Sequence, residues 1–265
     1  MPASPIGVFD SGVGGLSVLK EVLYQLPHED IIYLADTARL PYGNKSPEEI
    51  IKINQEIIPF LISRGAKLVI IACGTSSAIA YPALKDLYPV EMINLIGPGS
   101  QAAVKSSHNG QIGLIATQGT VNSGAYQEAI TAISPNSTVI AQACPLFVPL
   151  IEGGHLDSDE TRKIAKGYLK PILDAKADTL ILGCTHYPHL APLLKQLVGP
   201  RVTLVDPAIE AVAEAKTWLK RAGTLREAPT HPKYEFLVTG PVPQFEELGS
   251  LLLGKPISHA KHVII

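Results

Sequence analysis

The sequence predicts an α/β protein with two similar domains and mainly parallel sheets. Two stretches of about 70 residues each open with an Ile-Gly strand and a polar turn, and each closes with an apolar strand that ends in cysteine. Apolar residues at helical spacing separate these strands, as in parallel α/β units. Because parallel sheets bind ligands beyond the carboxyl ends of their strands, we expect Cys73 and Cys184 to face one cleft between the domains.

Strands and helices alternate in the first stretch. Its predicted strands lie at residues 6–9, 31–34 and 68–72. A glycine-rich turn at residues 10–15 leads from the first strand into a helix, which leucines at helical spacing predict for residues 16–26. Ser46 and Glu49 form a capping box before a second helix, which we expect to reach about residue 63 with a kink at Pro59.

The second stretch and the tail repeat this alternation. Their predicted strands lie at residues 112–116, 139–144, 179–183 and 234–238. Their predicted helices lie at residues 123–133, 158–175, 206–223 and 244–253. We expect the tail to complete the domain that carries Cys73, so that residues 1–97 and 207–265 form one domain and residues 98–206 form the other.

The composition excludes several classes of protein. With 46% hydrophobic and 17% charged residues among 265, it is typical of a compact soluble protein. The net charge of -2 and the lack of a basic run argue against a nucleic-acid partner. No apolar stretch approaches the ~20 residues of a membrane span, and residues 1–5 do not resemble a signal peptide. Three widely separated cysteines argue against a disulfide framework, so we expect a cytoplasmic protein.

Two of the three cysteines occupy matched positions. Cys73 and Cys184 each follow an apolar strand, and each is followed by a threonine within two residues. One such cysteine is usually a small buried hydrophobe, but two in the same context favour a function. Cys144 lacks this context, and we interpret it as structural.

Three other signals have both a structural and a functional interpretation. The turn at residues 12–15 lacks the nucleotide-binding Gly-x-Gly-x-x-Gly spacing, so a tight turn is favoured, with carboxylate binding by its amides as the alternative. The histidines of segment 184–189 have no second half-site elsewhere, so we expect no metal. Asp10 and Glu152 fit either a site or a local turn.

Four separated motifs together resemble bacterial glutamate racemase, within the aspartate/glutamate racemase superfamily. They are Phe-Asp-Ser-Gly-Val-Gly-Gly-Leu-Ser at residues 9–17, Leu-Pro-Tyr-Gly at 40–43, Ala-Cys at 72–73 and Leu-Gly-Cys-Thr-His-Tyr-Pro at 182–188. The resemblance covers nearly the whole chain. It implies two αβα domains and a cofactor-independent enzyme that interconverts L- and D-glutamate and supplies D-glutamate for peptidoglycan. Family members are often dimers, so the resemblance also allows a homodimer.

The resemblance also implies roles for individual residues. Cys73 would take the α-proton from D-glutamate while Cys184 protonates the opposite face, and the roles would reverse for L-glutamate. Asp10 would assist Cys73, His186 would assist Cys184, and Glu152 would tune the second thiol. The substrate-binding residues implied by the resemblance are Asp10, Ser11, Pro41, Tyr42, Gly43, Gly74, Thr75, Thr117, Thr120, Thr185 and His186.

The chemistry of the residues agrees with such a reaction. Inverting a stereocentre needs a base on one face and an acid on the other. Thiols suit both tasks, because neighbours can lower their reference pKa of about 8.5 toward neutrality. Donors at the α-carboxylate would have to stabilise the developing carbanion.

One position departs from the family pattern. Residues 72–75 read Ala-Cys-Gly-Thr, where the family usually has Ala-Cys-Asn-Thr. We expect Gly74 to leave a gap beside Cys73 that either water or a bulkier substrate could fill. With a bridging water we expect a raised KM for glutamate, which Gly74→Asn lowers. The alternatives are a racemase or isomerase for another acid such as aspartate, and a non-catalytic interaction protein.

Overall fold

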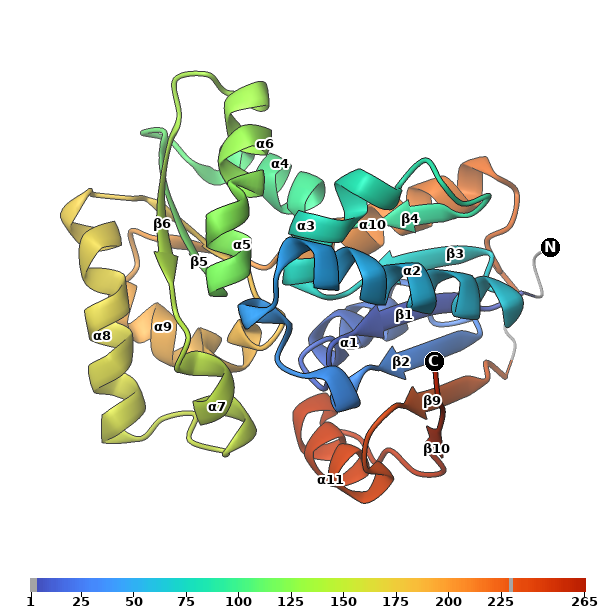
Figure 1. Ribbon diagram of the computed structural model, residues 1–265. Coiled ribbons are helices and arrows are strands. Elements are labelled where there is room, and N and C mark those ends of the chain that lie inside the picture. Colours follow the sequence, from blue (N-terminus) through green and yellow to red (C-terminus); the bar gives the residue numbers. More distant parts are fainter. Residues whose placement is uncertain (1–3, 229–230) are drawn as a thin grey trace.

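Two parallel sheets form the frame of the protein (Figure 1). The computed structural model describes residues 4–228 and 231–265, so residues 1–3 of the N-terminal segment considered above lie outside it. The strands are β1 (Ile6–Asp10), β2 (Ile31–Ala35), β3 (Leu68–Ile71), β4 (Glu91–Ile93), β5 (Gln111–Ala116), β6 (Thr138–Ala143), β7 (Thr179–Leu182), β8 (Thr203–Val205), β9 (Tyr234–Val238) and β10 (Lys261–His262).

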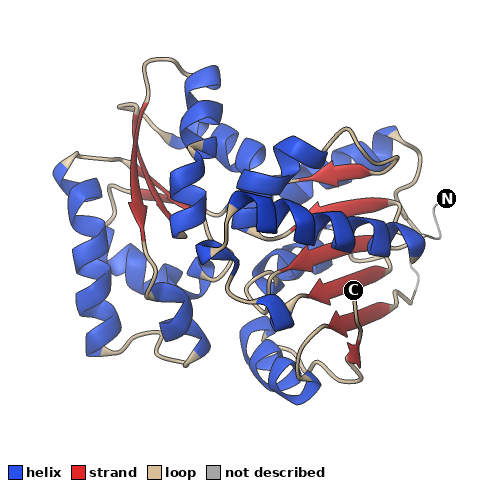
Figure 2. Ribbon diagram, in the orientation of Figure 1, coloured by secondary structure: helices blue, strands red, loops and turns tan. Residues whose placement is uncertain are grey.

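Helices connect and cover these strands (Figure 2). The α-helices are α1 (Leu16–Gln25), α2 (Pro47–Ser63), α3 (Gly74–Leu84), α4 (Ile96–Ser106), α5 (Gln118–Ser123), α6 (Ala125–Ile133), α7 (Phe147–Glu152), α8 (Asp159–Asp174), α9 (Ala191–Val198), α10 (Pro207–Arg221) and α11 (Val242–Leu253). Short 3-10 helices are η1 (Thr37–Arg39), η2 (Tyr42–Asn44) and η3 (Tyr187–Leu190). None of the described helices is both long and apolar enough to cross a membrane.

The strand order confirms the predicted fold class. The first sheet has the order β10-β9-β2-β1-β3-β4 and the second the order β6-β5-β7-β8. All neighbouring strands in both sheets are parallel. The strands that follow α10 return to the first sheet, as expected for the tail. The domain boundaries near residues 97 and 207 stay a prediction.

The central strands of each sheet are buried on both faces, which explains their continuous apolar runs in the sequence. In β1, Ile6 and Val8 pack with α1 and α11 on one face, whereas Phe9 packs with α2 on the other. The second sheet is covered by α8 and α9 on one face and by α4 and α6 on the other. These helices cover the faces of the second sheet and leave the carboxyl ends of its strands available for a site.

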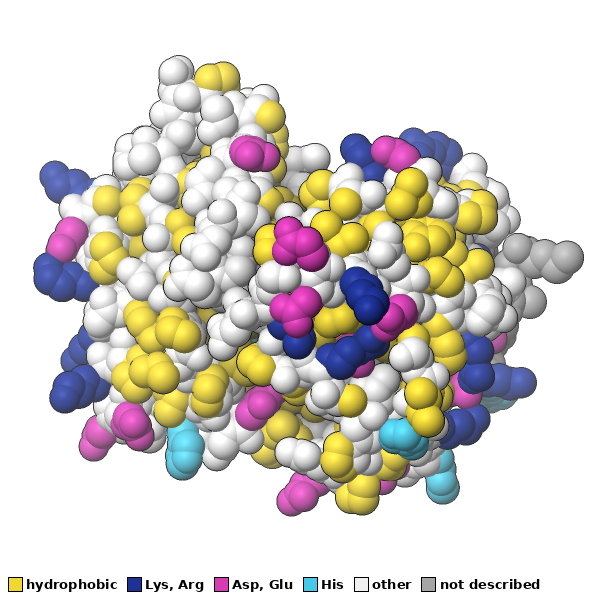
Figure 3. All heavy atoms as spheres, viewed as in Figure 1, with side chains coloured by type: hydrophobic (Ala, Val, Ile, Leu, Met, Phe, Trp, Pro, Cys, Tyr) yellow, Lys and Arg dark blue, Asp and Glu magenta, His cyan; other side chains and the backbone are white. Residues whose placement is uncertain are grey.

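The largest hydrophobic cluster contains residues from both sheets. Val8 of the first sheet and Leu182 of the second belong to this cluster, together with apolar residues of α1, α8 and α10. Helix α10 packs against both α1 and α4, and so connects the two halves. On the face drawn in Figure 3, basic and acidic side chains are interspersed around yellow apolar patches.

Helix α2 was predicted from its capping box, whereas several short or buried helices were missed. The capping box before α2 is present: Ser46 Oγ accepts from Glu49 N at 3.2 Å, and Glu49 Oε2 accepts from Ser46 N at 3.0 Å. Pro59 lies inside this helix, and the kink stays a prediction. Helices α3, α4, α5, α7 and α9 were not predicted. Helix α3 is buried on most sides, so it lacks the amphipathic spacing that reveals a surface helix.

Candidate active site

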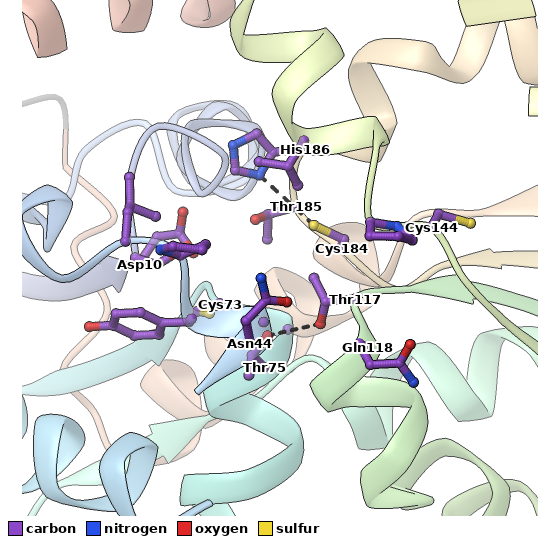
Figure 4. Close-up of a pocket in the computed structure, with 18 of the residues that line it drawn as sticks. Asp10, Asn44, Cys73, Thr75, Thr117, Gln118, Cys144, Cys184, Thr185 and His186 are labelled. Atoms are coloured by element: carbon purple, nitrogen blue, oxygen red, sulfur yellow. Dashed lines mark hydrogen bonds between the residues drawn. The ribbon is translucent and has the colours of Figure 1, made fainter. Parts of the chain in front are cut away.

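Loops at the carboxyl ends of six strands surround one cavity of about 350 Å³ (Figure 4). The loops after β1, β2 and β3 come from the first sheet, and those after β5, β6 and β7 come from the second. The lining residues are Asp10, Ser11, Leu40, Pro41, Tyr42, Gly43, Asn44, Cys73, Gly74, Thr75, Thr117, Gln118, Cys144, Pro145, Val148, Pro149, Glu152, Gly183, Cys184, Thr185 and His186. The structure thus brings together every predicted site residue except Thr120.

Several lining residues were missed by the sequence reasoning. They are Leu40, Asn44, Gln118, Cys144, Pro145, Val148, Pro149 and Gly183. The strand that precedes Cys144 was predicted, so the rule that ligands bind beyond strand ends could have identified the segment after it. Cys144 Sγ lies 3.5 Å from the carbonyl oxygen of Gln142 and points away from Cys184 in Figure 4. Its interpretation as a structural thiol stays a prediction.

The two thiols lie at equivalent positions in the two sheets. Cys73 follows β3, the neighbour of β1, and Cys184 follows β7, the neighbour of β5. Their exposed fractions are only 4% and 7%. Figure 4 shows the thiols on different loops of the same cavity. A small molecule between them could therefore be approached by one thiol from each sheet.

Cys184 is linked to an imidazole and a carboxylate. Its Sγ lies 3.9 Å from Nδ1 of His186, and Nε2 of His186 lies 3.0 Å from Oε1 of Glu152. Burial acts to lower the pKa of His186, but its hydrogen bonds with Cys184 and Glu152 outweigh this and raise the pKa to about 10. A protonated His186 can donate to the thiolate of Cys184 and stabilise it.

The second histidine of segment 184–189 has a different environment. Burial and the nearby charge of His186 lower the pKa of His189 to about 4, so its imidazole is neutral at pH 7. Within residues 4–228 and 231–265, no three or more His, Cys, Asp or Glu side chains are grouped so as to hold a metal ion.

Asp10 is held in place by the glycine-rich turn. Its Oδ2 accepts hydrogen bonds from the backbone N–H of Gly15 at 2.8 Å and of Gly12 at 3.2 Å. Its Oδ1 is buried and has no partner among the described residues. Burial raises the pKa of Asp10 against the opposing influence of His186 and the amides. The turn at residues 12–15 thus positions a site carboxylate, in agreement with a structural interpretation of its glycines.

The environment of Cys73 disfavours its ionisation. Burial, together with the negative charge of Asp10, raises the pKa of the Cys73 thiol to about 12. The Asp10 carboxylate therefore disfavours the thiolate of Cys73, in addition to the effect of burial. A thiol with this pKa carries its proton at pH 7.

A chain of hydroxyl groups crosses between the two halves of the site. Thr75 Oγ1 and Thr117 Oγ1 are 3.0 Å apart, and Thr117 Oγ1 lies 3.0 Å from Thr120 Oγ1. Thr75 follows β3, whereas Thr117 caps α5 in the second half. Thr120, which is buried and does not line the cavity, can act on a ligand only through Thr117.

Gly74 does not leave the gap that was expected beside Cys73. A Cβ atom at position 74 would lie 2.5 Å from the backbone carbonyl oxygen of Gly183. The backbones that follow β3 and β7 thus approach each other too closely for any side chain. The expectation of a water-filled gap is wrong, because the neighbouring backbone occupies the space.

Comparisons with known proteins agree with this geometry. The sequence model of the Asp/Glu/Hydantoin racemase family matches residues 6–215. A glutamate racemase of Lactiplantibacillus plantarum is 42% identical over 260 residues, which cover 97% of this chain and 95% of that protein. One of Synechocystis is 46% identical over 251 residues, with coverages of 95% and 89%.

Solved structures are similar over the whole chain. A glutamate racemase isoform from Bacillus anthracis has a TM-score of 0.96 at 37% identity, covering 100% of this chain and 99% of that one. Glutamate racemase from Francisella tularensis in complex with D-glutamate has a TM-score of 0.93 at 36% identity, with coverages of 100% and 98%. The chain therefore belongs to the Asp/Glu/Hydantoin racemase family and, within it, to the glutamate racemases.

Proposed function

We propose that this protein interconverts L- and D-glutamate without a cofactor, using Cys73 and Cys184 as the two acid–base groups. The observation that carries the proposal is that both thiols, from equivalent strand ends of two sheets, line one cavity. A substrate whose α-carbon lies between them has one thiol on each face. By family membership, the D-glutamate produced serves peptidoglycan synthesis.

The reaction needs one proton to leave and another to arrive. With D-glutamate, the Cys73 thiolate accepts the α-proton and the Cys184 thiol donates its proton to the opposite face. The C–H electron pair passes to the carbanion and then into the new C–H bond, which leaves Cys184 as the thiolate. The protonated His186, 3.9 Å from Cys184 Sγ, stabilises that thiolate. With L-glutamate the same steps run in reverse.

Burial and the charge of Asp10 oppose the ionisation of Cys73. The buried Asp10 carboxylate disfavours the thiolate, and its raised pKa brings it closer to accepting the thiol proton itself. We infer that Asp10 acts as the partner that receives this proton when substrate is bound. Hydroxyl and backbone N–H donors around the cavity then stabilise the carbanion at the α-carboxylate.

We also propose that the protein is cytoplasmic. The three described cysteines are free thiols, as expected in the reducing cytoplasm. A homodimer remains a prediction from the family.

Circular dichroism of L-glutamate or D-glutamate incubated with the pure protein tests the function. We expect the optical activity of either enantiomer to decay to zero, and aspartate to react more slowly. Cys73→Ala and Cys184→Ala should each abolish the decay while the far-UV spectrum of the protein stays unchanged. Near-wild-type turnover by either variant would end the two-thiol mechanism, and a preference for aspartate would reopen the substrate assignment.

A further inference from the structure

The cavity offers little positive charge to a dicarboxylate. Among the described lining residues there is no lysine or arginine, and His186 is the one side chain that is cationic at pH 7. The cavity also contains the carboxylates of Asp10 and Glu152. If glutamate is the substrate, as proposed above, its two carboxylates must be held mainly by neutral hydrogen-bond donors.

Most of the polar side chains around the cavity already have partners. The hydroxyl of Tyr42 donates to the buried carboxylate of Asp36. The hydroxyls of Thr75 and Thr117 bond to each other. These groups are therefore limited in what they can still donate to a ligand.

Two amide side chains line the cavity, and they differ in their partners. Gln118 Nε2 donates to Asn122 Oδ1 at 2.7 Å, and Figure 4 shows this side chain turned away from the thiols. The amide of Asn44 forms no hydrogen bond within the part of the chain that the structure describes. In Figure 4 its amide points into the cavity, above Thr75 and on the same side as Thr117 in this view. Asn44 is thus an amide with two free N–H groups at the cavity.

The backbone holds Asn44 at this position. It ends η2, whose first residue, Tyr42, is tied to Asp36. The middle residue, Gly43, packs so closely on α5 that a Cβ there would lie 2.9 Å from Cβ of Thr117. The turn therefore bridges the two halves of the site, and Asn44, which is exposed, stands at the mouth of the cavity.

We propose that Asn44 is a substrate-binding residue, whose amide N–H groups donate to the substrate carboxylate that reaches the Thr75–Thr117 side of the cavity. The position next to Cys73 cannot supply such an amide, because Gly183 excludes a side chain at Gly74. Asn44 provides it from the loop that follows β2. The proposal rests on glutamate, or a similar dicarboxylate, being the substrate.

Steady-state kinetics of three variants test the proposal. Asn44→Ala should raise KM for glutamate about 3- to 10-fold, the range of one hydrogen bond exchanged with water, and leave kcat unchanged. Asn44→Asp keeps the shape but replaces both donors by negative charge, so its KM should rise at least as much. Asn136→Ala, at an exposed asparagine in the turn before β6, is the control and should match wild type.

Binding of D-glutamate measured by calorimetry separates this proposal from the proposed function. The dissociation constant should rise in Asn44→Ala by the same factor as KM. Absence of turnover by wild-type protein would overturn the racemase function. Unchanged KM and unchanged D-glutamate affinity in Asn44→Ala would overturn the role of Asn44, and so would wild-type kinetics of Asn44→Asp, because a residue that only shapes the loop tolerates that change.

Discussion

A side chain at position 74 is expected to force apart the two strand ends that carry the thiols. The Cβ of Gly74→Ala would lie 2.5 Å from the carbonyl oxygen of Gly183, about 0.9 Å short of the 3.4 Å at which ordinary contact begins. The backbone at Gly183 is held in place, because its N–H donates a hydrogen bond to the carbonyl oxygen of Ile115 at 2.8 Å. The displacement therefore falls on the segment of Cys73.

The size of this displacement predicts a loss of turnover rather than of folding. A misplacement of about 1 Å in a reacting group can reduce rates about 100-fold. Overpacking of this kind costs about 1–3 kcal/mol of unfolding free energy, which most proteins tolerate. We expect Gly74→Ala to lower kcat about 10- to 100-fold with a small change in KM, and Gly74→Asn to be at least as impaired.

Steady-state racemisation kinetics of each variant test the predicted loss of kcat, and thermal unfolding tests whether the variant stays folded. Gly97→Ala is the matched control, since Gly97 also lies in the first turn of a helix but has no neighbour within 4 Å of an added Cβ. It should retain wild-type kcat. Wild-type turnover in Gly74→Ala would refute the close contact, and a lowered KM in Gly74→Asn would restore the expectation drawn from the sequence.

Three further predictions concern single residues. L- and D-glutamate have equal free energy in water, so kcat/KM must be the same in both directions and cannot reveal which thiol Asp10 assists. The α-deuterium isotope effect can differ between the directions, and Asp10→Asn should enlarge it more for D-glutamate than for L-glutamate. Equal isotope effects would contradict the pairing of Asp10 with Cys73. Cys144→Ala should racemise glutamate at a near-wild-type rate in the same dichroism assay, because its thiol points away from Cys184; an inactive but folded variant would place it in the site. Hydrogen bonds from Ser107 and nearby amides outweigh burial and lower the pKa of Asp178. Its stabilising effect is therefore present above the unfolded pKa of about 3.8 and is lost as pH falls through the lower folded value. Asp178→Asn should cost about 1–3 kcal/mol in urea unfolding at pH 7 and much less at pH 3; an equal cost at both pH values would show that charge is not involved.

The elements that were predicted correctly are those whose signal is local. Burial on both faces gives strands such as β3 and β7 an uninterrupted apolar run, and a capping box marks the start of α2. The grouping of Cys73 and Cys184 also followed from the sequence, because strand ends of a parallel sheet meet at one edge.

The missed features depend on contacts between segments that are distant in sequence. Asn44 lies in a loop without periodicity, and only the packing of Gly43 on α5 brings it to the cavity. The contact of Gly74 with Gly183 likewise joins the two sheets. The raised pKa of Cys73 follows from burial and from a carboxylate on another strand, neither of which a local pattern reveals.

The hydrophobic cluster that extends over both sheets has a consequence for how the protein unfolds. Since Val8 and Leu182 belong to the same cluster, and α10 packs on helices of both halves, neither sheet can lose its packing while the other keeps it intact. Calorimetry should record a single melting transition, and separately expressed halves should be insoluble. Damage far from the thiols, anywhere along this common interior, then reduces the amount of active enzyme as surely as damage beside them.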